Sequence, residues 1–357
     1  MTMLGTASPT SNNSHEWLAS IHFDTAEKFL EYISPTQLQW LSPSGINGSW
    51  IFRGQYNSDW NLTPSAMRSE KLTDFKKLER PVLEKSVFDL YSNRQTNLNF
   101  QYICDWLVQT AAEELALEEF VRMADHVGHL IPTGHQFLLA DSGYSPEIWT
   151  DKVRQYFVSL DQGYANLDMF RLTPTTIERA LAQHHGIPTR LLDWTYSSFA
   201  AAYFAAEEAV LALAGHQHNV PLRIAVFALR RSAIDDWHKE GDPRSESLKY
   251  IEHRRGSLEY LRAQHGLFVF DAGADKHFLN QGQWRTFEEV LFYKFGNAAS
   301  ETIQKITLPV DQSFQLLRLL AAFGVTRAHL MPSLDTVKDT LEIDRILKNQ
   351  FDGSYHP

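Results

Sequence analysis

The densest group of side chains that could do chemistry lies between positions 183 and 195. This segment reads QHHGIPTRLLDWT, and its polar members are Gln183, His184, His185, Thr189, Arg190, Asp193 and Thr195. The leucines and the tryptophan among them predict a strand that is substantially buried. A buried charge without a partner is costly. Arg190 and Asp193 therefore either form ion pairs that lock the strand in place or bind a ligand, and the sequence leaves both interpretations open.

His184 and His185 are predicted to stand at the end of a helix that stops at Gly186. Because histidine changes charge near neutral pH, either ring could act as a general base, with Asp193 orienting it. The alternative for each histidine is a structural role. Neighbouring residues on a helix point about 100° apart, so the two rings cannot readily share one metal ion. No recognised metal-binding spacing occurs either, so no metal is expected.

A second candidate is the arginine in the segment WIFRGQ, which is predicted to be a strand followed by a turn. Arg53 would place a fixed cation at the strand's end, and Gly54 would let a ligand approach the backbone closely. Gln55 adds a polar group beside them. The alternative is an arginine in a structural salt bridge.

Two later segments complete the set of candidates. Arg262 and Gln264 lie in RAQHGLF, where a helix end is predicted to lead through a glycine into a strand. Glu288 and Glu289 are predicted at the start of a strand over residues 290–295. A carboxylate in that place could hold a sugar hydroxyl or stabilise a cationic transition state, as in glycosyl transfer. A solvated acidic face is the alternative.

The composition bounds the class of protein. The chain has 357 residues and a net charge of −10, which argues against extended binding to nucleic acid, since that needs clustered cations. With Cys104 as the single cysteine, an internal disulfide and a multi-cysteine zinc site are excluded. The longest apolar stretch is interrupted by Glu207 and Glu208, so no membrane span is expected. The first fifteen residues do not resemble a secretion signal, and a cytoplasmic location is expected.

The order of elements predicts an α+β fold with a mixed β-sheet core and a helical insertion at about residues 71–170. Strands are predicted at 49–54, 189–194, 223–229, 267–270, 290–295 and 303–308. Residues 1–20 are predicted to be a disordered polar tail, residues 21–345 the folded domain, and residues 346–357 a C-terminal tail.

Several of these segments together resemble the FRG-domain family, named for its (F/Y)RG motif. The matching positions, in chain order, are 50–55, Trp60, Leu62, Pro64, Ser65, Arg68, 183–195, 201–205, Arg262, Gln264, Gly266, Phe268, 305–309 and 330–334. The resemblance covers roughly residues 25–340, interrupted by the helical insertion. It implies that function lies at these motif positions, and a role in phage defence or as a toxin suits this kind of domain.

The order of elements is also similar to the ADP-ribosyltransferase fold, which is an analogy of fold only. It implies NAD as substrate and cleavage of the nicotinamide–ribose bond. Arg53 would then bind the ribose or diphosphate, residues 189–195 would line the nicotinamide slot, and Glu288 or Glu289 would stabilise the cationic sugar. The alternatives are a non-catalytic module that binds a nucleotide or a protein, and a histidine-based hydrolase or nuclease. The target macromolecule cannot be derived from the sequence.

Overall fold

The computed structural model describes residues 18, 20–41, 49–68, 70–91, 99–129, 131, 177–215, 217, 219–239, 248–252 and 259–352. The predicted N-terminal tail lies almost wholly outside these residues, as does the second half of the predicted helical insertion.

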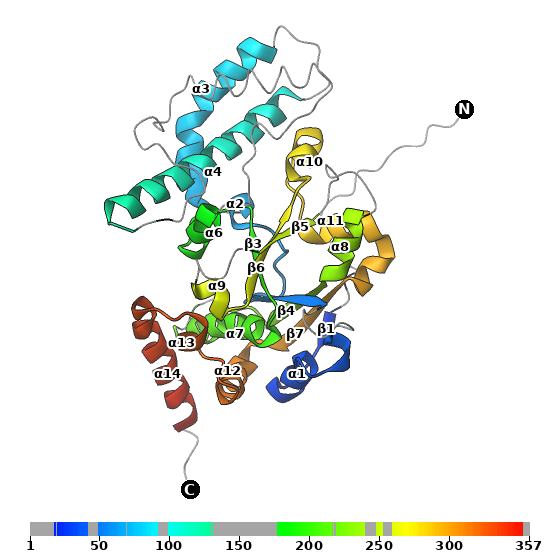
Figure 1. The fold of residues 1–357 in the computed structure, drawn as a ribbon, viewed down its shortest axis with the longest axis vertical. Helices are drawn as coiled ribbons and strands as arrows, with labels where there is room; N and C mark the ends of the chain where they lie inside the picture. The colour runs from blue at the N-terminus through cyan, green and yellow to red at the C-terminus, as the bar shows by residue number, and fades with distance from the viewer. Residues whose placement is uncertain are drawn as a thin grey trace, which may run out of the picture.

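The described strands form one mixed sheet in the order β1-β7-β4-β2-β3-β6-β5 (Figure 1). Its strands are β1 (Ser20–His22), β2 (Trp50–Gln55), β3 (Leu192–Thr195), β4 (Arg223–Arg230), β5 (Leu248–Ile251), β6 (Gly266–Asp271) and β7 (Ile303–Pro309). β1 and β7 run parallel, and every other neighbouring pair is antiparallel. The predicted α+β class with a mixed sheet is confirmed.

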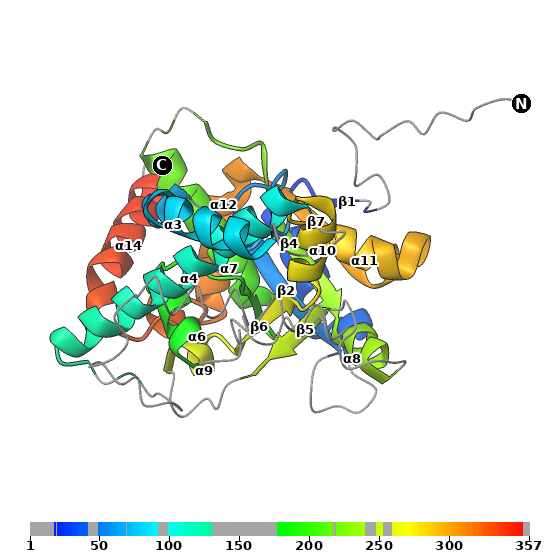
Figure 2. The same cartoon turned by 90° about the horizontal axis from the view of Figure 1, so that it is seen from above.

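Helices cover both faces of the sheet (Figures 1 and 2). They are α1 (Ala26–Ile33), α2 (Ser65–Arg68), α3 (Thr73–Tyr91), α4 (Phe100–His126), α6 (Ile177–His184), α7 (Ser198–Ala214), α8 (Arg231–Lys239), α9 (Glu259–Ala263), α10 (Ala274–Gln281), α11 (Phe287–Phe295), α12 (Ser313–Ala322), α13 (Arg327–Leu330) and α14 (Val337–Asp352). Short 3-10 helices span Leu38–Trp40, Glu70–Leu72, Gly296–Glu301, Val310–Gln312 and Leu334–Thr336.

Alternation of side chains along the strands divides the core into two layers. Phe52 of β2 points to the layer that holds α1, α7 and α12. Ile51, its neighbour, points to the opposite layer with α11. Helices α3 and α4 fall within the predicted insertion; they pack side by side and project from one end of the sheet.

The predicted strand at 290–295 is wrong, because these residues form the helix α11. Thr286 and Glu289 form a capping box that starts the helix, and such a box satisfies backbone donors that are otherwise unpaired. Phe287, Val290 and Leu291 then fall on one buried helical face. The β-branched and aromatic residues in this run favoured a strand, and the cap with its tertiary packing overrides that preference. At the other end of the chain, α14 continues to Asp352, so residues 346–352 are not a tail.

Gly54 marks the point where α7 crosses β2. A Cβ atom built on Gly54 would overlap the carbonyl oxygen of Ala201 and lie 3.0 Å from the backbone nitrogen of Ala205. The space beside this glycine is therefore filled by the helix and not by a ligand, which corrects the prediction for Gly54. The same contact explains the alanines after position 198, because only small side chains allow a helix to approach a strand this closely.

Candidate functional site

The strands β2 and β3 diverge at the centre of the sheet. They share one paired position, Phe52 with Thr195. Beyond it, β2 stays paired with β4 as far as Gln55, whereas β3 is paired with β6 back to Leu192. We call this place, together with the side chains of Arg53, Arg68, Asp193 and Glu208 that gather there, the strand fork.

Arg53 bridges the two diverging strands. Its Nη1 atom donates a hydrogen bond of 2.8 Å to the backbone carbonyl of Asp193 and lies 3.8 Å from Oδ2 of the same residue. Two candidate segments that are 140 positions apart in the sequence are thereby brought together. The guanidinium replaces part of the ladder that β2 and β3 no longer form.

The guanidinium of Arg53 is mostly enclosed but only partly hydrogen-bonded. Its side chain is 15% exposed, and its Nε atom is buried without a hydrogen-bond partner. Burial lowers the pKa of Arg53 below its ordinary value, and the carboxylate of Asp193 opposes this shift. Glu208 and Glu288 also act on this charge, although they come from helices on opposite faces of the sheet. The charge of Arg53 is therefore affected by carboxylates from both layers.

Asp193 is held in place from the side of α6. Its carboxylate is 62% exposed and accepts a hydrogen bond of 2.8 Å from Nε2 of Gln183. Gln183 in turn accepts a hydrogen bond from the hydroxyl of Thr189. Thr189 is buried, and its backbone nitrogen donates to the hydroxyl of Ser65 of α2. Gln183 and Thr189 thus position Asp193, and this chain of contacts also fixes α2 beside the fork.

Two residues of the fork were given no role from the sequence, although one of them, Arg68, is a motif position. Arg68 ends α2, and its guanidinium lies over the ring of Trp60 at 5.7 Å from the centroid. Glu208 lies on α7 with its side chain open to solvent; partial desolvation by the surrounding protein raises its pKa above the ordinary value, while Arg68 and Arg53 oppose the shift. Glu208 falls seven residues after Ala201 on the alanine-rich helix, so the sequence could have placed it on the same helical face as Ala201. From the sequence it was considered only as a charge that interrupts an apolar stretch.

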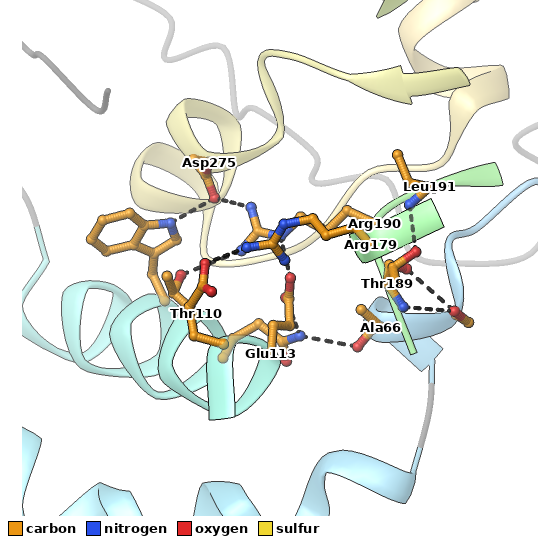
Figure 3. Close-up of polar contacts among 12 residues, drawn as sticks. Ala66, Thr110, Glu113, Arg179, Thr189, Arg190, Leu191 and Asp275 are labelled. Carbon is orange, nitrogen blue, oxygen red and sulfur yellow. Dashed lines mark hydrogen bonds and ion pairs between the residues drawn. The ribbon is translucent and has the colours of Figure 1, made fainter. Parts of the chain in front are cut away.

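Arg190 does not reach the fork but anchors the helical insertion (Figure 3). Its guanidinium forms ion pairs with Glu113 of α4, at 2.8 Å, and with Asp275 of α10. It also donates to the hydroxyl of Thr110 and lies over the ring of Trp284. Burial alone would lower the pKa of Arg190, but the two carboxylates outweigh it and raise the pKa. The structural interpretation is the one that the geometry supports, with partners other than Asp193.

The two histidines take part in a row of stacked rings. His184 stacks on Tyr260 with 3.7 Å between ring centroids, and His185 stacks on Phe120 of α4 at 5.8 Å. Burial, with the neighbouring His185, lowers the pKa of His184 to about 4. Within the described part of the chain, neither ring is hydrogen-bonded to Asp193, which accepts from Gln183 instead. The geometry gives no support to an Asp193–histidine pair.

The acidic candidates have structural contacts. Glu288 is 2% exposed, and its two carboxylate oxygens accept from the backbone nitrogen of Leu62 at 2.8 and 3.0 Å. Glu289 accepts from the backbone nitrogen of Thr286 in the capping box. Both lie on α11, so the prediction that they stand at the start of a strand is wrong.

The remaining candidates lie around the fork without entering it. Gln55 is buried and donates to the carbonyls of Asn57 and Trp60, so it shapes the turn after β2. The hydroxyl of Thr195 donates to the carbonyl of Gln264, whose side chain donates to the carbonyl of Leu330. These contacts tie β3 to α13. Arg262 is exposed on α9.

Two general searches of the described residues gave no site. They contain no group of three or more His, Cys, Asp or Glu side chains placed to hold a metal ion. Of the helices that can be described, none is both long and apolar enough to cross a membrane. Burial raises the pKa of Cys104 to about 12, so this thiol is not activated as a nucleophile.

A comparison with protein-family models gives one match, over residues 147–212, to the family described as FRG domain. The chain carries an FRG domain. The described part of the match contains α6, β3 and most of α7, and so supplies Gln183, Asp193 and Glu208 to the fork. Searches against curated proteins and against solved structures found no match.

Proposed function

We propose that the FRG domain binds a nucleotide at the strand fork, with NAD as the ligand, and cleaves its nicotinamide–ribose bond or transfers the ADP-ribose. The observation that carries the proposal is the state of Arg53. A guanidinium has five N–H donors in a fixed fork that suits phosphate oxygens. Among the described residues, Arg53 uses one hydrogen bond, to Asp193, while its Nε atom has none.

The surroundings of Arg53 suit a ligand of mixed charge. Arg68 supplies a second cation, and the ring of Trp60, which is 42% exposed, offers a flat apolar surface. The carboxylates of Asp193 and Glu208 both act on the charge of Arg53 and could face a sugar or a positively charged nicotinamide. A diphosphate joined to two ribose rings and two flat bases matches this combination of groups.

The alternative in which a histidine acts as a hydrolytic base has no such support. A base works best when its pKa is close to the working pH. The low pKa of His184 and the stacking of its ring on Tyr260 both favour a structural role. Binding of a nucleotide without turnover remains the second candidate function, because the fork would serve it equally well.

The test is a calorimetric titration of the full chain with NAD. Arg53→Ala is expected to weaken binding by about 10-fold or more, because a hydrogen bond to a charged group contributes about 1.5–3 kcal/mol. Arg53→Lys should also weaken it, since lysine lacks the planar fork. Arg345→Ala, an exposed arginine on α14, is the control and should bind as the parent does. Equal affinity of the parent and both Arg53 variants would reject the proposal.

A further inference from the structure

Resting on the proposed function, we infer that Glu208 is the carboxylate that acts on the ribose of the bound nucleotide. It would stabilise the positive charge that develops on the sugar and take the proton of the attacking water. This assigns to α7 the role that the sequence analysis gave to Glu288 or Glu289.

Helix geometry puts Glu208 on the face of α7 that meets β2. Residues 201, 205 and 208 are spaced at four and three, so they lie on one face of α7. At the first two positions the backbone of this face presses against Gly54 of β2. Glu208 lies about one turn further along this face of α7. It is exposed there, although the other residues of this face are buried.

The charges around Glu208 place it beside Arg53 and Arg68. Both arginines stabilise its carboxylate, and Glu208 in turn acts on the charge of Arg53 and on the hydroxyl of Tyr56. A carboxylate at this point would meet a ligand whose phosphates are held by the same two arginines.

Within the described part of the chain, the carboxylate of Glu208 forms no hydrogen bond within 3.5 Å and no ion pair within 4.0 Å. The other acids near Arg53 are engaged. Glu288 holds the backbone of Leu62, and Asp193 accepts from Gln183 and lies 3.8 Å from Arg53.

The reaction balances with water as the second reactant. The bond between the ribose C1′ and the nicotinamide nitrogen breaks, and its electron pair leaves with neutral nicotinamide. The oxygen of a water molecule bonds to the cationic C1′, and Glu208 accepts the proton that this water loses. The products are ADP-ribose, nicotinamide and one proton, which Glu208 returns to the solvent.

The experiment compares Glu208→Gln with the parent in two assays, calorimetric NAD binding and chromatographic release of nicotinamide. We expect the variant still to bind NAD, because glutamine has the same shape and Arg53 and Arg68 remain, and to release nicotinamide about 100-fold more slowly or worse. The parent's rate should fall in acid with an apparent pKa above 4.5, the ordinary value for glutamate, and the variant should lack this dependence. Glu342→Gln, an exposed glutamate on α14, is the matched control and should behave as the parent.

The outcomes separate this inference from the proposed function. A parent that binds and cleaves NAD, with Glu208→Gln cleaving it equally fast, overturns the role of Glu208 and leaves the nucleotide site in place. A parent that neither binds NAD nor releases nicotinamide overturns both. Thermal unfolding of the variant at the parent's temperature excludes a folding defect as the cause of lost activity.

Discussion

Side chains at the centre of this domain divide into those that hold the fold and those with unused capacity. Arg190 and Arg53 are both enclosed arginines of the FRG segments, yet their surroundings differ. Arg190 is matched by two carboxylates and a hydroxyl. Arg53 has one backbone carbonyl and a carboxylate 3.8 Å away. A ligand anion can therefore improve the surroundings of Arg53 but not those of Arg190.

His184 should make the stability of the domain depend on pH. Its pKa falls from 6.5 in the unfolded chain to about 4 in the fold, so the unfolded chain binds more protons between these values. The contribution is complete above pH 6.5 and is lost as the pH falls toward 4. Replacing His184 with Phe keeps an aromatic ring to stack on Tyr260 and removes this dependence.

The measurement is urea unfolding of the parent and of His184→Phe at pH 7.5 and 4.5. Between these values the parent should lose more free energy of unfolding than the variant, by on the order of 1–3 kcal/mol. His184→Gln should show the same reduced dependence despite losing the stacked ring. Identical losses in all three proteins would mean that His184 is not held neutral by its surroundings.

At the scale of elements, the crossing of α7 over β2 is what builds the fork. The backbone of the helix rests directly on Gly54, and this contact sets how far along the sheet Glu208 is carried. Gly54 is thus explained by packing, whereas the proposed ligand-binding role falls to Arg53 before it.

Gly54→Ala should therefore destabilise the fold strongly. Its new methyl group would overlap the carbonyl of Ala201, and neither backbone can retreat from a central strand without disturbing the sheet. We expect a loss of about 3 kcal/mol in urea unfolding, at the upper end for an overpacked core. Gly215→Ala, at the end of the same helix, is the control, because its φ is −77° and its methyl group would meet only the helix's own last turn. It should change stability by less than about 1 kcal/mol. Equal effects at the two glycines would argue against the close crossing.

The sequence predicted the elements that depend on local patterns. The strand with Arg53, the alanine-rich helix and the buried strand at 223–229 follow from periodicity and turn residues. The run after Glu289 was misassigned because its side chains suit a strand as well as a helix, and only the cap and the packing of α11 decide between them. The position of Glu208 was missed for a related reason, since it depends on which strand the helix crosses.

For the whole molecule, the convergence of distant segments was predicted from resemblance and not from physics. Arg53 and Asp193 meet because β2 and β3 are neighbours in a seven-stranded order that no local pattern specifies. The partners of Arg190 come from α4 and α10, 77 and 85 positions away along the chain, so its pairing could not be derived from its own segment. The residue types along the chain identified the candidates, but only the topology shows which of them have structural partners.

A separate cavity of about 310 Å³ offers an internal comparison for the location of the site. It lies between α1 and α12, and its lining includes Leu30, Phe199, Leu319 and Phe323 but no residue of the fork. A ligand could occupy this cavity and leave the fork untouched, so binding alone does not identify where NAD is held.

Hydrogen–deuterium exchange with and without saturating NAD is the measurement that tests the central claim most directly. If the fork is the site, exchange should slow in the peptides that cover residues 55–68, 183–193 and the last turns of α7 after Glu208, because a bound ligand closes local opening there. Peptides of α14 should exchange at the same rate in both samples. Slower exchange confined to α1 and α12, or no change anywhere at a concentration that saturates the protein, would contradict the account.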